Sequence, residues 1–261
     1  MSLNWMDTQG ISFNSLLLLE RVQISWMADW SLDQEMALAL RANPAVAWYL
    51  RHKCPEAEPW LERLEAIEVD ASDAQAVYAA EQHILQKMND WLVYVVDPAV
   101  YDAQPFLNWD SQELSGLVDF SGKVVLDIGA GTGRLAFVAA PQAQTVYCVE
   151  PVGNLRCYIR EKARRMGLHN VYAVDGLITE IPFPDGFADV CMGGHVFGDE
   201  PERELSELER VTRPGGMVIL CPGSSERENE AHQVLVKGGY QWSRFEEPRD
   251  GWKRKYWKVM E

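Results

Sequence analysis

The sequence has no apolar run long enough to cross a membrane. A membrane helix needs roughly 18 to 20 consecutive apolar residues, whereas the leucine run at residues 16–19 is followed directly by Glu20 and Arg21. The first residues also lack a basic region ahead of an apolar segment, so we expect no secretory signal. We therefore expect a cytoplasmic protein with no membrane partner.

Cysteine pairs at a metal-binding spacing are absent as well. The chain has 5 cysteines, none of them in a CxxC arrangement, and three of them lie inside apolar runs that are typical of strands. Thiols in such runs are expected to be buried and reduced. We therefore expect neither a disulfide framework nor a metal site.

Basic residues are scarce in the N-terminal part of the chain. Residues 1–110 contain 17 acidic and 6 basic side chains, and the whole chain has a net charge of −15. An acidic surface of this strength repels phosphate backbones. We therefore expect no nucleic-acid partner, and the composition leaves the oligomeric state open.

Strand patterns are almost absent before residue 118. Capping residues and helical apolar spacing predict helices throughout, including one long helix over residues 72–96 that Asp97-Pro98 ends. Seven of the ten tryptophans fall in this segment. Their spacing leaves open whether they form a core or line an aromatic pocket. The pattern predicts an all-helical domain over residues 1–118.

From Gly122 onward, short apolar runs alternate with charged helical stretches. The runs KVVLDIG, TVYCVE, NVYAV, FADVCMG and GMVILC are typical of buried strands. This alternation predicts an α/β fold with a doubly wound parallel sheet. The last segments, GGYQWSRFEE and WKRKYWKVM, are separated by a Pro-Arg-Asp-Gly turn and predict an antiparallel hairpin at the edge of that sheet.

The first predicted strand ends in a turn with three glycines, Gly129, Gly131 and Gly133. In open α/β sheets, ligands bind beyond the carboxyl ends of the strands, and glycines let backbone N–H groups approach them closely. The spacing is GxGxG, because Arg134 stands where a dinucleotide fold needs a third glycine. Asp127, just ahead of the turn, favours a cationic ligand over a pyrophosphate.

Acidic residues also follow the next two predicted strands. Glu150 ends the second strand, where its carboxylate oxygens could accept hydrogen bonds from both hydroxyls of a ribose. Asp175 follows the third strand and could accept from an adenine amino group, with Leu177 against the ring. No P-loop lysine or serine follows the glycines. Together these markers fit a cationic, phosphate-free adenosine compound.

Four motifs occur in the order LDIGAGTG, CVEP, VDGLITEIPFPDGFADV and LERVTRPGGMVIL. In this order and spacing the chain resembles the class I S-adenosylmethionine-dependent methyltransferases, particularly their type 11, small-molecule group. The resemblance covers residues 120–222, and residues 223–261 more loosely. It implies a Rossmann-like methyltransferase domain over residues 119–261, with a seven-stranded, mostly parallel sheet and an antiparallel last hairpin. It also implies S-adenosylmethionine as cofactor and a small-molecule acceptor.

The resemblance also assigns individual residues. It would place the methionine part of the cofactor at the glycine turn, its ribose on Glu150 and its adenine at Asp175, with Gly193 to His195 beside the sulfonium and the acceptor. The predicted cofactor-binding residues are Asp127, Gly129, Ala130, Gly131, Gly133, Glu150, Pro151, Asp175, Gly176, Leu177 and Gly193.

Methyl transfer from a sulfonium is an in-line displacement, to which a protein contributes mainly by alignment and by excluding water. Only an acceptor that must lose a proton needs a general base. His195 is the first candidate for that catalytic role, with Asp199 and Tyr240 behind it. A structural role for His195 is the alternative.

The helical segment is interpreted as a substrate-binding lid that selects the acceptor. Two other functions are compatible with the same motifs. One is a sensor or scaffold that binds the cofactor without transferring its methyl group. The other is a nicotinamide oxidoreductase, which Arg134 disfavours by its size in the glycine turn.

Overall fold

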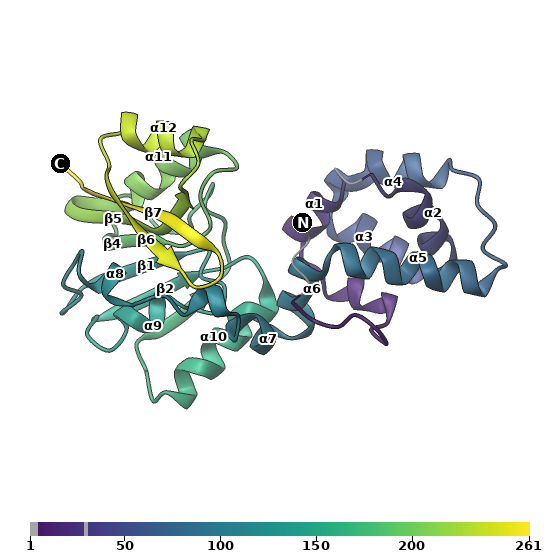
Figure 1. The fold of residues 1–261 in the computed structure, drawn as a ribbon, viewed down its shortest axis with the longest axis horizontal. Coiled ribbons are helices and arrows are strands. Elements are labelled where there is room, and N and C mark those ends of the chain that lie inside the picture. Colours follow the sequence, from purple (N-terminus) through teal and green to yellow (C-terminus); the bar gives the residue numbers. More distant parts are fainter. Residues whose placement is uncertain (1–4, 29–30) are drawn as a thin grey trace. The chain divides into compact units, whose positions relative to one another are not determined.

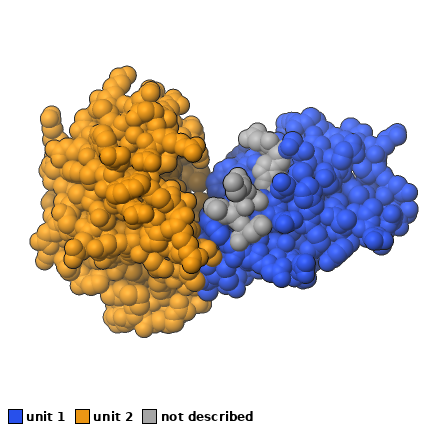
Figure 2. All heavy atoms as spheres, viewed as in Figure 1, with its two compact units in different colours: residues 1–101 blue, residues 102–261 orange. Residues whose placement is uncertain are grey.

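The computed structural model describes residues 5–28 and 31–261, so Trp30 lies outside the described residues. The chain divides into two compact units, Met1–Tyr101 and Asp102–Glu261, which Figure 2 colours separately. Each unit is described by itself. Within the described ranges, no helix combines the length and the apolar character needed to cross a membrane.

The first unit is built from helices, as the sequence predicts (Figure 1). Apolar side chains from most of these helices, such as Leu16, Ile24 and Leu64, are buried between them. The elements are η1 (Phe13–Leu18), α1 (Arg21–Met27), α2 (Asp33–Ala42), α3 (Pro44–Lys53), η2 (Pro55–Ala57), α4 (Glu58–Glu65), α5 (Ala74–Lys87), α6 (Asn89–Val96) and α7 (Pro98–Asp102).

The prediction of one long helix over residues 72–96 is wrong in one respect, because the structure has two helices there, α5 and α6. Asn89 begins α6, and its buried carboxamide holds the N-terminal segment. Its Oδ1 accepts from the backbone N–H groups of Trp5 (2.7 Å) and Met6 (3.1 Å), and its Nδ2 donates to the Met6 carbonyl (2.6 Å). The apolar periodicity continues through this break, so the pattern cannot reveal it.

The tryptophans before residue 118 divide between core and surface. Trp60 and Trp109 are each 3% exposed, whereas Trp48 is 61% exposed. Trp5 packs its ring against Tyr101 at 5.2 Å between centroids. Among the described tryptophans of this segment, Trp60 and Trp109 are therefore core residues, whereas Trp48 is a surface residue.

The second unit is organised around one seven-stranded sheet with the order β3-β2-β1-β4-β5-β7-β6 (Figure 1). All neighbouring strands are parallel except the β5–β7 and β6–β7 pairs, so the expected sheet and its antiparallel last hairpin are confirmed. The strands are β1 (Val124–Ile128), β2 (Thr145–Val149), β3 (Val171–Val174), β4 (Ala188–Gly193), β5 (Thr212–Ser225), β6 (Gln241–Glu247) and β7 (Gly251–Val259).

Helices cover both faces of this sheet, because alternate strand residues are apolar on both sides. Val125 and Val146 belong to a core cluster with residues of α8, α9 and α10, whereas Leu126 and Ile128 belong to a second cluster with residues of α11 and α12. The elements outside the sheet are η3 (Pro105–Leu107), α8 (Gln112–Ser115), α9 (Ala136–Ala139), α10 (Gly153–Arg165), α11 (Pro201–Val211) and α12 (Glu230–Lys237).

Strand order reverses between β1 and β4. The chain proceeds from β1 to β2 and β3 on one side and returns to β4 on the other, where Ile128 of β1 lies opposite Gly193 of β4. Crevices at such switch points are where open α/β sheets bind ligands. The glycine turn after β1 and the segment after β4 therefore start at the same point of the sheet.

Residues 102–118 belong to the sheet unit, although the sequence suggested a boundary at 118/119. Arg134, at the end of the glycine turn, donates to the carbonyl oxygens of Leu107 (2.7 Å) and Trp109 (2.6 Å). Lys255 of β7 binds the carbonyl and the carboxylate of Glu113 at 2.8 and 2.7 Å. These long-range contacts hold a helical segment against the sheet, and helical patterning alone does not reveal them.

Candidate functional site

The three glycines of the turn all have a left-handed backbone. Their φ angles are +61° at Gly129, +56° at Gly131 and +84° at Gly133, a region that costs other L-residues energy. A Cβ on Gly129 would lie 2.3 Å from the Val196 Cγ2 atom. Glycine is thus required in this turn by the positive φ angles and, at Gly129, by the close contact with Val196. Ala130 is buried within the turn.

Asp127 lies near the end of β1, 1% exposed, beneath the glycine turn. Its Oδ2 accepts a hydrogen bond from the backbone N–H of Ala136 at 2.9 Å. Burial raises the pKa of Asp127 from 3.8 to about 7, and the nearby charge of Glu150 adds to the rise while the Ala136 N–H opposes it. Its ionised form therefore lacks a compensating positive charge.

Glu150 follows β2 and is also buried, 4% exposed. Its Oε2 accepts from the Gly131 N–H at 2.8 Å and its Oε1 from the Val152 N–H at 2.9 Å. Burial raises the pKa of Glu150 to about 7, although both N–H groups and the charge of Arg156 act in the opposite direction. The structure therefore brings Glu150 and the glycine turn together, as the sequence predicts.

The residues after β3 are more open. The Asp175 side chain is 75% exposed and forms an ion pair with Arg156 at 2.6 Å. Gly176 is closely packed, because a Cβ there would lie 2.7 Å from Pro182 Cδ. Leu177 is 39% exposed, so an apolar surface is available beside Asp175. Pro151, after Glu150, is half-buried.

The segment after β4 packs onto the glycine turn. A Cβ on Gly193 would lie 2.7 Å from Val196 Cγ1, the same side chain that lies against Gly129. His195 lies between Gly193 and Val196 in the chain. It has a φ of +55° and donates its backbone N–H to the Pro222 carbonyl at 2.9 Å. The structure therefore places His195 close to the turn through Val196.

The other two candidate bases, Asp199 and Tyr240, have different surroundings from His195. The backbone N–H of Asp199 binds the Glu204 carboxylate at 3.2 Å, in a loop that Glu204 also holds through Gly198 and Glu200. Tyr240 is 4% exposed, and burial raises the pKa of its hydroxyl. A buried phenol that resists ionisation is a poor proton acceptor.

The residues at the turn fit the cofactor that the motifs imply. An ionised carboxylate offers about four lone-pair positions, and Glu150 uses one on each oxygen for the hydrogen bonds to Gly131 and Val152. The positions that remain can accept the two hydroxyls of a ribose. Thr132 Oγ1 in the same turn is buried without a hydrogen-bond partner among the described residues. The two buried carboxyl groups match a ligand with a positive charge.

Arg134 does not enter this turn. Its guanidinium lies 4.4 Å from the Trp109 ring centroid and binds the carbonyls of residues 107 and 109. The side chain is thus held by Leu107 and Trp109, at the position where a dinucleotide fold needs a closely packed glycine. Across residues 5–28 and 31–261, no cluster of three or more histidine, cysteine, aspartate or glutamate side chains could hold a metal ion.

Two residues at this edge of the sheet were not identified from the sequence. Arg156 lies on α10, and its Nη1 donates to the Glu150 carbonyl and to Asp175, both at 2.6 Å. Glu247 ends β6 and binds the His195 ring at 2.7 Å. No local pattern announces either contact, because the partners are joined only when the strands assemble.

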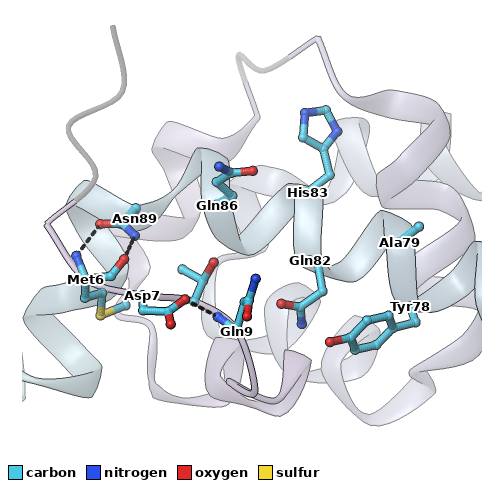
Figure 3. Close-up of a pocket in the computed structure, with 10 residues that line it drawn as sticks. Met6, Asp7, Gln9, Tyr78, Ala79, Gln82, His83, Gln86 and Asn89 are labelled. Atoms are coloured by element: carbon cyan, nitrogen blue, oxygen red, sulfur yellow. Dashed lines mark hydrogen bonds between the residues drawn. The ribbon is translucent and has the colours of Figure 1, made fainter.

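The helical unit contains a polar cavity of about 740 Å³, between the segment at residues 6–9 and one side of α5. Figure 3 shows Tyr78, Gln82 and Gln86 of α5 along this cavity. His83 also lines it, and its Nδ1 lies 3.2 Å from the Glu35 carboxylate. Its volume is in the range of small-molecule sites, roughly 300 to 1,000 Å³.

Residues 126–220 match a family described as "Methyltransferase domain". The chain is 30% identical over 124 residues to a demethylmenaquinone methyltransferase of Geobacillus stearothermophilus, covering 45% of this chain and 53% of that protein. It is 37% identical over 101 residues to an uncharacterized methyltransferase of Mycobacterium sp. (strain JLS), covering 38% of each. The chain thus spans about half the length, or less, of these two relatives.

Solved structures with a similar fold include a SAM-dependent methyltransferase from Aquifex aeolicus. That structure has a TM-score of 0.48 and 19% identity, and the match covers 62% of this chain and 97% of the other. The family match begins after the helical unit, within the first strand of the sheet.

Proposed function

We propose that this chain, which carries a class I S-adenosylmethionine-dependent methyltransferase domain, transfers a methyl group to a small-molecule acceptor by in-line displacement. The relative named for demethylmenaquinone supports a small molecule as acceptor. When bound, S-adenosylmethionine supplies the methyl group from a sulfonium. The chain's own residues bind this cofactor, orient the acceptor and exclude water.

One observation carries the proposal: two buried carboxyl groups, Asp127 and Glu150, flank a left-handed glycine turn at the switch point of the sheet. We assign Glu150 to the ribose, the turn and Asp127 to the charged methionine part, and Asp175 with Leu177 to the adenine. Gly193 and His195 would then face the reacting groups.

Cofactor binding is expected to tighten as the pH rises toward 7. Both carboxyl groups have a pKa raised to about 7, and a cationic ligand with two hydroxyl donors prefers their ionised forms. Below that pH, binding must first remove protons, so the dissociation constant for S-adenosylmethionine should rise by about tenfold per pH unit for one group. In contrast, a raised carboxyl pKa stabilises the ligand-free fold at low pH, and that stability is lost as the pH rises from about 4 to about 7.

Calorimetry in buffers of different ionisation enthalpy measures both the affinity and the protons released. We expect S-adenosylmethionine and S-adenosylhomocysteine to bind with proton release at about pH 6 and with little release at about pH 8. NAD⁺ serves as the control ligand and should not bind. Binding of NAD⁺ in preference to the adenosine compounds would contradict the proposal, as would the absence of any S-adenosylhomocysteine binding.

We propose in addition that the helical unit, predicted over residues 1–118 and compact over 1–101, binds the acceptor. The polar cavity along α5 supports this, because it offers amide and hydroxyl groups that can bind the polar groups of an acceptor. An acceptor-selecting unit also distinguishes a methyltransferase from a cofactor-binding scaffold, which needs no such cavity.

Filling the cavity tests this assignment. Ala79 is exposed and lines the cavity on α5, so Ala79→Trp should lower methyl transfer at least tenfold, because bulk placed in a binding site excludes the ligand. Binding of S-adenosylhomocysteine should not change. Gln75→Trp, at an exposed position on the same helix that is not one of the lining residues, is the matched control and should leave both properties unchanged. Equal transfer rates in the two variants would contradict an acceptor site in this cavity.

A further inference from the structure

The His195 and Glu247 side chains form a hydrogen-bonded pair that the sequence motifs do not explain. His195 Nε2 and Glu247 Oε1 are 2.7 Å apart, although the residues are 52 positions apart in the chain. The Glu247 side chain is 0% exposed, whereas that of His195 is 34% exposed. A buried carboxylate thus holds an imidazole that solvent or a ligand can reach.

The backbone and the ring of His195 are held from several sides. Its φ of +55° is unusual for a residue with a side chain, and its N–H is bound to the Pro222 carbonyl at 2.9 Å. The Phe106 ring meets the imidazole edge to face, with 5.6 Å between centroids. These contacts leave the ring little freedom to rotate.

The carboxylate determines which ring nitrogen carries the proton. An ionised carboxylate can only accept hydrogen bonds, so Nε2 must donate and Nδ1 of the neutral ring keeps a free lone pair. The charged groups nearby come from several elements. Lys253 Nζ of β7 lies 3.6 Å from Glu247 Oε2 and pairs with Asp250. The Cys221 thiol on β5 is affected electrostatically by four charged groups, which therefore lie near it and near one another: Lys255, Glu113, Glu247 and Arg134.

We propose that Glu247 is a positioning residue that orients His195 as a general base, and that the acceptor is therefore an acidic hydroxyl compound, a phenol or an enol. This inference rests on the proposed methyltransferase function. As the O–H bond of the acceptor breaks, its proton bonds to Nδ1 and the O–H electron pair stays on the oxygen. A lone pair of that oxygen forms the new bond to the methyl carbon, while the electron pair of the carbon–sulfur bond leaves with sulfur.

The class of acceptor follows from matching proton affinities. General-base catalysis works best when the proton affinities of the base and of the proton donor are close, and an imidazole is closer in this respect to a phenol or an enol than to an aliphatic alcohol. Phe106 beside the imidazole gives an aromatic acceptor a ring to pack against. An acceptor that carries no dissociable proton would leave the pair without a role.

The pair is first tested without turnover, by long-range ¹H–¹⁵N spectra of the histidine rings in the full-length protein. In the unmodified chain we expect His195 in the Nε2–H form. Glu247→Gln should shift it toward a mixture of forms, because an amide can both donate and accept. Glu228→Gln is the matched control, since Glu228 lies 3.8 Å from His232, and it should leave the His195 signals unchanged. A His195 ring that is unaffected by Glu247→Gln overturns the proposal.

Activity is measured with catechol and 1,4-naphthalenediol as hydroxyl probes and aniline as the amine probe. We expect methylated hydroxyl products, a kcat lower by about 10²- to 10⁴-fold in His195→Gln, and a smaller loss in Glu247→Gln with KM unchanged. Both variants should retain S-adenosylhomocysteine binding, which also shows that they fold. A preference for aniline, or the absence of transfer to either hydroxyl probe by a protein that binds S-adenosylhomocysteine, overturns the inference. Absence of S-adenosylhomocysteine binding in the unmodified chain instead refutes the proposed function.

Discussion

Glu150→Ala is expected to lower the affinity for S-adenosylhomocysteine by about 100-fold or more. The variant removes both oxygens that we assign to the ribose hydroxyls. A hydrogen bond to a charged group contributes roughly 1.5 to 3 kcal/mol, and tenfold in affinity corresponds to about 1.4 kcal/mol. Two such bonds therefore account for the expected loss. Calorimetry or a thermal-shift titration measures it, since a ligand stabilises the fold by RT ln(1 + [L]/Kd).

The same variant leaves the N–H groups of Gly131 and Val152 without their present acceptor. A looser turn could by itself weaken binding, so Glu150→Gln is the second variant, because it keeps the shape and one acceptor oxygen. We expect it to bind less tightly than the unmodified chain and to unfold at a similar temperature. Glu161→Ala, an exposed carboxylate on α10, is the matched control. Unchanged affinity in both Glu150 variants would refute the ribose assignment.

Gly129→Ala is expected to destabilise the sheet unit by about 2 to 5 kcal/mol. The left-handed backbone costs a non-glycine residue roughly 1 to 2 kcal/mol, and an extra methyl in a packed interior costs about 1 to 3 kcal/mol. Here the new Cβ would lie 2.3 Å from Val196 Cγ2. For a unit of this size, 1 kcal/mol lowers the melting temperature by roughly 2 to 4 °C. The melting temperature should therefore fall by about 4 to 20 °C.

Gly167→Ala is the matched control for this prediction. Gly167 has a similar φ of +69°, but a Cβ there meets no atom within 4 Å. It should therefore show only the backbone cost, about 1 to 2 kcal/mol. Adding Val196→Ala to Gly129→Ala should recover part of the lost stability, because it removes the nearest clashing methyl. An equal loss of stability in Gly129→Ala and Gly167→Ala would show that the contact between Val196 and the turn does not contribute to the effect.

Much of the sheet unit could be predicted because its signals are local. Apolar runs such as Val124–Ile128 are recognisable as strands from a few neighbouring residues, and the three glycines are required by the backbone of the turn. Glu150 was assigned to the site because it follows a strand, and carboxyl ends of neighbouring parallel strands meet at one edge. These predictions needed only the spacing of residues along the chain.

Other features depend on contacts between distant segments. The break between α5 and α6 coincides with hydrogen bonds from Asn89 to residues 5 and 6. The assignment of residues 102–118 to the sheet unit depends on Arg134 and Lys255. Apolar periodicity indicates which side of a helix is buried, but it does not show which segment packs against that side. It therefore cannot predict the break between α5 and α6 or the start of the sheet unit.

The sequence alone determined the α/β order of strands and helices, the glycine turn and the acidic residues at the strand ends, since each follows from local conformation and residue type. Only the tertiary structure decided that Glu247 meets His195, that Arg156 bridges the Glu150 carbonyl and Asp175, and that two carboxyl groups become buried enough for their pKa values to rise. The physical reason is that burial and hydrogen-bond partners arise when separate segments pack together. The linear pattern of residues does not show which distant segments come into contact.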